Sequence, residues 1–368
     1  MMRTDVFFDV VKTAPRNDLW DVLKGLGILA VVIGHSGCPE PLQRFISAFH
    51  MPLFFIISGI LLNELYFDNK KIFIKKKVKS LYIPFVKWAL IFILFHNIFF
   101  YFGILNSTYG YAGNTDRWYT FQDVVYSLFV AIISMNTFEH LLGAFWFIKA
   151  LFIGSILFVL LCTKCARIYR LFFQFFPVAI WILCIANIIA KDSFSVLNFI
   201  EVRFIGHNEF FAMFFISLGF LMKRYIHYLY GLNKCVVGFI VLFAISQIES
   251  VSMAPMIMNV LLLPFSAVGG FIFLLNIGHI FVKKSKWSVY IIRNMGVFSF
   301  YILALHFTCF KIISFVKIYL YDLDFDLIAE FPVISIYNEY FWIIYSLVGA
   351  FLSFELGKRI ERIPFFRR

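Results

Sequence analysis

The chain has 368 residues, of which 62% are hydrophobic and only 15% are charged. Soluble domains contain about 45–50% apolar and about 25% charged residues, so this composition excludes a soluble protein and predicts a multi-pass membrane protein. The formal net charge is +12, but because no basic region stands apart from the apolar runs, we expect no nucleic-acid partner. Residues 1–368 are predicted to form a single integral membrane domain.

Apolar runs long enough to cross a bilayer recur along the whole chain. A transmembrane helix needs roughly 17–25 residues. The sequence therefore predicts an all-α polytopic bundle of about ten transmembrane helices. These helices are expected at residues 19–37, 45–66, 82–103, 142–162, 171–190, 208–222, 235–250, 257–282, 297–317 and 340–357.

Lys and Arg residues give this bundle a direction, because they concentrate in cytoplasmic loops. With the N-terminus inside, the basic residues fall in every second connection and the acidic residues gather in the connections between them. We therefore expect both termini to be cytoplasmic. The apolar segment Phe121–Ser134 would reverse all later loops if it were a further span, so it is predicted to be an interfacial or re-entrant helix on the outer side.

The first predicted helix carries ionisable side chains at both ends of one face. Lys24 and His35 are eleven residues apart, which is about 16 Å along a helix. Eleven steps of about 100° return to within about 20° of the starting direction, so both side chains lie on one stripe. Because an ionisable residue at membrane depth is costly, such a stripe indicates a functional site.

Further polar residues are predicted to lie toward the outer half of the membrane. Each has a structural alternative: a histidine can bond a neighbouring backbone, a lysine can extend to the interface, and a glutamate can cap a helix. If the bundle brings them together, they form an acid–base cavity that opens outward. They are His50, Lys149, Arg203, His207, Glu209, His306 and Lys311.

This set of residues suits group transfer to a hydroxyl. A histidine can take the hydroxyl proton, and a cation or hydrogen-bond donor can stabilise the oxyanion. The sequence contains no Gly-x-Ser-x-Gly, His-Glu-x-x-His or phosphate-loop motif. Cys162 and Cys165 form an isolated pair without a second pair or a histidine, so we expect free thiols and no metal.

Four stretches together resemble a known family of membrane enzymes. They are residues 16–35, residues 49–59, the basic run that leads into residues 81–85, and residues 298–306. At these positions the chain resembles acyltransferase family 3, and within it the fucose 4-O-acetylase-like branch. The resemblance implies an acyl donor, usually acetyl-CoA, that enters from the cytosol. It also implies a sugar acceptor at the outer face of a bacterial plasma (inner) membrane.

The residues and the resemblance together predict a membrane O-acyltransferase, specifically an O-acetyltransferase that modifies a cell-surface or lipid-linked polysaccharide. His35 matches the essential histidine of the family and is predicted to be the general base or an acyl relay. Lys24 stands where many members have arginine and is predicted to be its catalytic partner. The acceptor side is predicted to comprise His50, Trp146, Lys149, Arg203, Glu209 and His306. The CoA phosphates are predicted to contact Arg16, Lys75, Lys76, Lys77 and Lys79.

Alternatives remain open at this stage. The basic run at residues 70–79 can simply mark an inner loop beside anionic lipid headgroups. A secondary transporter or exporter of a glycan precursor would use the same histidines, but it would normally show two related halves with broken helices. We find no convincing repeat, although Pro255 precedes the eighth predicted span and Pro264 lies within it, and proline can break a helix. A non-catalytic scaffold would not need a cation aligned with a histidine. Homo-oligomers and glycan-assembly partners stay open.

Overall fold

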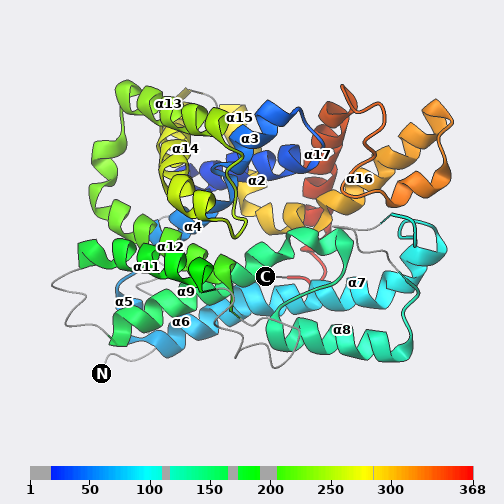
Figure 1. Cartoon of the computed structure of the whole chain (residues 1–368), viewed down its shortest axis with the longest axis horizontal. Coiled ribbons are helices and arrows are strands. Elements are labelled where there is room, and N and C mark those ends of the chain that lie inside the picture. The colour runs from blue at the N-terminus through cyan, green and yellow to red at the C-terminus, as the bar shows by residue number, and fades with distance from the viewer. Residues whose placement is uncertain (1–17, 110–116, 165–172, 191–204, 285, 368) are drawn as a thin grey trace.

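The computed structural model describes residues 18–109, 117–164, 173–190, 205–284 and 286–367. Within these ranges every regular element is a helix (Figure 1). The larger helices are α2 (Asp18–His35), α3 (Glu40–Ser47), α4 (His50–Ile60), α6 (Lys70–Lys77), α7 (Ile83–Tyr101), α8 (Phe121–Ser134), α9 (Trp146–Lys164), α11 (Phe176–Ile189), α12 (His207–Tyr225), α13 (Leu232–Ile248), α14 (Ile257–Lys284), α15 (Lys286–Val297), α16 (Ser299–Tyr321) and α17 (Phe341–Ile360). Short helical turns lie between them, among them α5 (Leu65–Asp68), the π-helical turn Val78–Tyr82 and the 3-10 turn His140–Phe145.

Seven helical segments of the described chain are long and apolar enough to cross a membrane. They are Glu40–Ile60, Lys70–Tyr101, His140–Thr163, His207–Leu229, Ile257–Lys283, Ser299–Tyr321 and Phe341–Ile360. This confirms the expected all-helical, multi-pass architecture. Three further predicted spans correspond to α2, which carries Asp18, Asp21 and Lys24, and to the shorter apolar helices α11 and α13. The count of about ten and the cytoplasmic location of both termini stay predictions.

Helix α2 lies inside the bundle, where α4, α14, α15, α16 and α17 pack around it (Figure 1). Its crossing with α15 depends on two glycines. A Cβ atom on Gly25 would lie 2.0 Å from the carbonyl oxygen of Ile292, and one on Gly296 would lie 1.8 Å from that of Asp21. Small residues allow helix backbones to approach closely in membranes, where van der Waals packing drives association. This crossing holds α2 in a fixed position next to the site.

Helix α8 runs beside α7 and the chain then returns to the end from which α8 started (Figure 1). The Tyr82 hydroxyl donates to Ile132 O at 2.7 Å, at the beginning of α7. His96 Nδ1 lies 3.0 Å from Glu139 Oε2, which is fourteen residues, or about 21 Å, further along α7. Only seven residues separate Ile132 from Glu139, so this segment must be extended. This places α8 antiparallel to the segment that follows it, and whether Phe121–Ser134 is interfacial or re-entrant stays a prediction.

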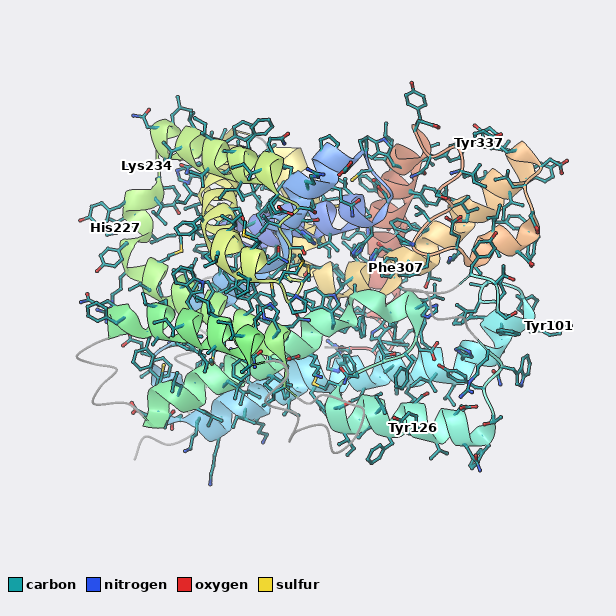
Figure 2. All side chains as sticks on the ribbon, in the orientation of Figure 1. Tyr101, Tyr126, His227, Lys234, Phe307 and Tyr337 are labelled. Atoms are coloured by element: carbon teal, nitrogen blue, oxygen red, sulfur yellow. The ribbon has the colours of Figure 1, made fainter. Side chains whose placement is uncertain are left out.

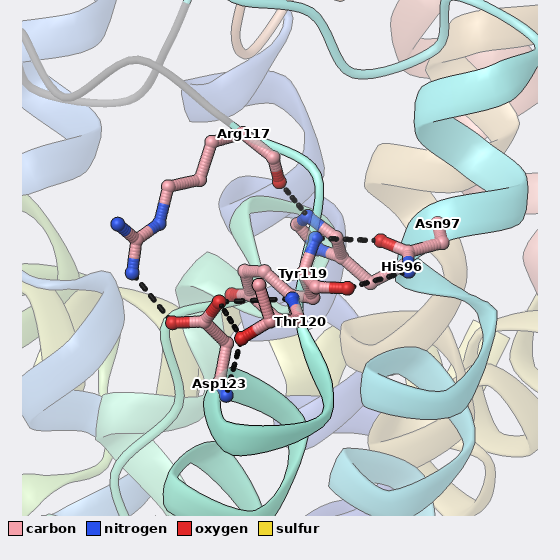
Figure 3. A network of polar contacts seen from close by, with 6 residues as sticks. All are labelled: His96, Asn97, Arg117, Tyr119, Thr120 and Asp123. Atoms are coloured by element: carbon pink, nitrogen blue, oxygen red, sulfur yellow. Dashed lines mark hydrogen bonds and ion pairs between the residues drawn. The ribbon is translucent and has the colours of Figure 1, made fainter.

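A polar network fixes the segment just before α8 to α7 (Figure 3). His96 bonds Arg117 O at 2.9 Å, and Asn97 exchanges two hydrogen bonds with the backbone of Tyr119 at 2.8 and 2.9 Å. Thr120 and Asp123 then form a capping box at the start of α8. Since buried polar groups need hydrogen-bond partners, these contacts determine where α8 begins.

Two buried lysines of α16 hold the connection between α16 and α17. Lys311 Nζ donates to Ile328 O at 2.9 Å and to Glu330 O at 2.8 Å, and Lys317 Nζ donates to Ile334 O at 3.0 Å. Lys311 is only 5% exposed. It therefore does not extend to the interface, which was one alternative for it, but anchors this loop by charge-assisted hydrogen bonds.

Candidate active site

Two histidines from distant parts of the sequence are in direct contact. His35 ends α2, and its Nδ1 atom lies 3.0 Å from Nε2 of His306 in α16. The two rings are nearly parallel, at 12°, with centroids 5.3 Å apart. Phe307, labelled near the middle of the molecule in Figure 2, packs its ring 4.9 Å from that of His35. His306 is completely buried, whereas His35 keeps partial exposure.

A third histidine lies close to this pair. His50 begins α4, and its Nδ1 atom lies 2.8 Å from Ile46 O, one helical turn earlier. It is near enough to interact electrostatically with His35. The structure thus brings together the histidines of the first, second and ninth predicted spans, which are separated in sequence by up to 271 residues. We refer to His35, His50 and His306 as the histidine cluster.

A cavity of about 430 Å³ leads toward the histidine cluster between α2 and α16. Lys24, Ile28 and Val31 form its wall on α2, and His35 is the next position on that stripe. From Val31 to His35 is about 6 Å along the helix axis. Its wall on α16 is Ser299, Phe300 and Leu303, and the next position there is His306. Its remaining lining residues are Met51, Phe54, Ile57, Ser58, Leu61, Leu62, Tyr66, Phe73, Lys76, Lys77, Ser80, Leu81, Phe147, Ile148 and Leu151.

The other end of this cavity is basic and polar. Lys24, Lys76 and Lys77 line it. Lys24 forms a 2.6 Å ion pair with Asp21 one turn earlier on α2, and Lys76 donates to the Tyr66 hydroxyl at 2.9 Å. We call this end the basic mouth. By the charge rule it is the end predicted to face the cytosol.

The remaining residues predicted to bind the donor are placed differently. Lys75 does not line the cavity, and Lys79 lines a separate pocket of about 200 Å³ together with Lys87 and Trp88. Regular helix geometry explains the difference, because Lys75 and Lys79 are four residues apart and share a face opposite the one that lines the cavity. The cavity-lining face of this segment is Phe73, Lys76, Lys77, Ser80 and Leu81. Arg16 lies outside the described residues.

The outer residues of the prediction form a second polar group away from the cavity. Lys149 Nζ donates to Asn136 Oδ1 at 2.9 Å and interacts electrostatically with Glu209. Glu209 Oε2 accepts from the backbone N–H of Gly206 at 2.6 Å, so this side chain caps the start of α12. Trp146 begins α9 one residue before the cavity wall. Arg203 lies outside the described residues.

Sequence reasoning missed part of the cavity. Tyr66, Ser58 and Ser80 add hydroxyl groups to its wall. Their only signal was their position close to the basic run and the second predicted span. Among the residues that the structure describes, no group of three or more His, Cys, Asp or Glu side chains is arranged to hold a metal ion.

Comparison with known proteins agrees with this architecture. A family model described as an acyltransferase domain matches residues 17–355, which is most of the chain and contains the histidine cluster and the cavity. The chain belongs to this acyltransferase family, acyltransferase family 3, and is a multi-pass membrane protein of that class. No curated protein and no solved structure matches it.

Proposed function

We propose that the protein is a membrane O-acetyltransferase, which moves an acetyl group from cytosolic acetyl-CoA to a hydroxyl of a cell-surface or lipid-linked polysaccharide. The observation that carries this proposal is a cavity with a basic mouth, in a chain of the acyltransferase family, whose wall on α2 ends at Val31, one helical turn before His35 of the histidine cluster. The fucose 4-O-acetylase-like branch and a bacterial inner membrane are parts of the same proposal.

The cavity suits a thioester donor with a long arm and a phosphorylated end. Its volume of about 430 Å³ falls in the usual range for small-molecule sites, about 300–1,000 Å³. The basic mouth offers Lys24, Lys76 and Lys77 to phosphate oxygens. The mostly apolar walls beyond it would hold a pantetheine arm, and the thioester would then lie at the inner end, beside His35.

The chemistry at that end is transfer of the acetyl group from the thioester sulfur of CoA to the hydroxyl oxygen of the acceptor. His35 removes the proton of the acceptor hydroxyl while its oxygen attacks the thioester carbonyl carbon. Collapse of the tetrahedral intermediate breaks the C–S bond, and the CoA thiolate receives the proton that His35 holds. The products are an O-acetyl ester and free CoA. A relay through acetylated His35 is the alternative, and labelled acetyl retained on the protein would identify it.

The acceptor would reach His35 from the outer side. His50 belongs to the histidine cluster, so we assign it to the acceptor path. Trp146, Lys149 and Glu209 lie on helices that begin near that side, and we keep them as acceptor-side residues. Lys149 and Glu209 also serve the fold, through hydrogen bonds with Asn136 and with the backbone of Gly206.

Transfer of radiolabelled acetyl from acetyl-CoA tests the proposal. Membranes that contain the wild-type chain should label the host's surface glycan, and His35→Ala at the same membrane level should not. His227, which is exposed outside the site and labelled in Figure 2, provides the matched control, and His227→Ala should keep wild-type transfer. Equal labelling by His35→Ala would refute the site. If the wild type transfers nothing but glycan export still requires it, the transporter alternative replaces our proposal.

A further inference from the structure

We infer that His306 is a positioning residue that fixes the tautomer of His35 and leaves His35 Nε2 free to act as the base. This inference rests on the proposed function and replaces the acceptor-binding role predicted for His306 from sequence. It follows from the order of hydrogen bonds from Ile302 through His306 to His35.

The first step concerns His306 alone. Its Nδ1 atom lies 3.0 Å from the carbonyl oxygen of Ile302, one turn earlier on α16. A carbonyl oxygen can only accept, so Nδ1 must carry the hydrogen. In a neutral imidazole the other nitrogen then has the lone pair, which makes Nε2 of His306 an acceptor.

The second step assigns the position of the hydrogen on His35. Since Nε2 of His306 accepts, the partner at 3.0 Å, His35 Nδ1, must donate. The hydrogen of a neutral His35 is therefore on Nδ1, and its lone pair is on Nε2. The described part of the chain gives His35 Nε2 no hydrogen-bond partner, so that nitrogen is available to a substrate.

The third step is access. His306 is 0% exposed, and the rings of Phe307 and Phe310 lie 4.0 and 5.7 Å from its own. His35, which keeps partial exposure, is the member of the pair that a substrate can touch. A buried group that orients a catalytic imidazole through its second nitrogen is the arrangement by which triad enzymes select the productive tautomer. His306 would do this here, and would share the positive charge that develops on His35.

Three substitutions at His306 separate orientation from packing. In His306→Gln the amide oxygen reaches the place of Nε2 and can still accept from His35. In His306→Asn the shorter amide can bond Ile302 O but does not reach His35. His306→Leu removes both bonds. We expect Asn and Leu to lower kcat about 100-fold or more, with the KM for acetyl-CoA unchanged, and Gln to recover at least about 10-fold of that loss.

Two results would overturn the inference. One is that His306→Gln is as impaired as His306→Leu although both proteins are folded and bind CoA like the wild type. The other is that these variants raise the acceptor KM and keep kcat at saturating acceptor, since that would mean that His306 contacts the acceptor.

A measurement without turnover tests the tautomer directly. Nitrogen-15 NMR of the histidine-labelled protein in lipid should show Nδ1–H and an unprotonated Nε2 for His35, and this pattern should be lost in His306→Leu. A wild-type His35 that carries its hydrogen on Nε2 would refute the inference even if the protein transfers acetyl. Conversely, failure of all acetyl transfer would refute the proposed function, and the NMR result would still decide the tautomer.

Discussion

Removal of single lysines at the basic mouth should weaken CoA binding by amounts that depend on their position. At about 4 Å, two unit charges attract by about 1 kcal/mol in water and by about 4 kcal/mol at an effective dielectric constant of about 20. Lys77 is half-buried and Lys76 is exposed, and both line the cavity. After allowance for solvent screening, we expect each alanine substitution to cost about 1–2 kcal/mol, which is about 5- to 30-fold in Kd.

Lys75 provides the matched control. It lies on the same helix, α6, directly beside Lys76, and is exposed, but it does not line the cavity. Lys75→Ala should change the Kd for CoA by less than about 2-fold at an ionic strength of 0.1 M, where the Debye length is about 10 Å. Tyr66→Phe removes the hydroxyl that accepts a hydrogen bond from Lys76 Nζ. It should weaken CoA binding less than Lys76→Ala, because the charge of Lys76 stays in place.

Equilibrium binding of CoA to the purified protein in lipid nanodiscs measures these effects. Higher salt should weaken wild-type binding more than binding by Lys77→Ala, because the variant has lost one screened charge pair. The reasoning would be refuted if Lys75→Ala weakened binding as much as Lys77→Ala, or if Lys76→Ala and Lys77→Ala both bound CoA like the wild type. Either result would mean that the CoA phosphates lie elsewhere.

Three further predictions concern stability and accessibility. Gly25→Leu should prevent correct assembly, because its Cβ atom would lie 2.0 Å from Ile292 O. Gly206→Ala should be tolerated, because the nearest atom to its Cβ would be 3.5 Å away. Size-exclusion profiles of the detergent extracts compare the two variants. His96→Ala should lower the free energy of unfolding by about 1.5–3 kcal/mol, measured by thermal denaturation, because it removes the buried bond to Glu139. Burial raises the pKa of the Cys38 thiol to about 11. Alkylation of Cys38 at pH 8 should therefore be slow in the folded protein and should accelerate only as the pH approaches 11. Labelling at pH 8 as rapid as that of the denatured protein would contradict this.

Much of the architecture followed from sequence because hydropathy and charge are local signals. The helical class needs only apolar runs of sufficient length. The alignment of Lys24 with His35 needs only the helical period, and the structure places the cavity wall on that stripe. Polarity and the family resemblance single out the histidines of residues 49–59 and 298–306, but they place these histidines beside His35 only if the bundle brings them together. The hydrogen bond between His35 and His306 and the closeness of His50 to His35 are findings of the structure.

Other features could not be read from sequence because they depend on backbone partners far along the chain. Lys311 anchors the loop at Glu330, and its sequence neighbours give no sign of this. The sequence gives no sign of the π-helical turn Val78–Tyr82, because the helical pattern of the cavity-lining residues continues through it. Apolar composition alone does not distinguish an interfacial from a re-entrant Phe121–Ser134, and the packing of α8 against α7 is visible only in the structure.

The positions of Lys24 and His35 along α2 give a physical reason for the presence of both residues on one helix. Lys24 at the basic mouth and His35 in the histidine cluster are about 16 Å apart along the axis, with only the cavity wall between them. A donor whose phosphates stay at the mouth can therefore present its thioester deep in the membrane without crossing it. Under the proposed function the acceptor need not cross either, because His35 lies at the end of α2 opposite Lys24. A rigid α2, held by its close crossing with α15 at Gly25 and Gly296, fixes the distance between the two ends. For this reason a helix insertion between Val31 and His35 should abolish transfer and leave CoA binding at the mouth intact.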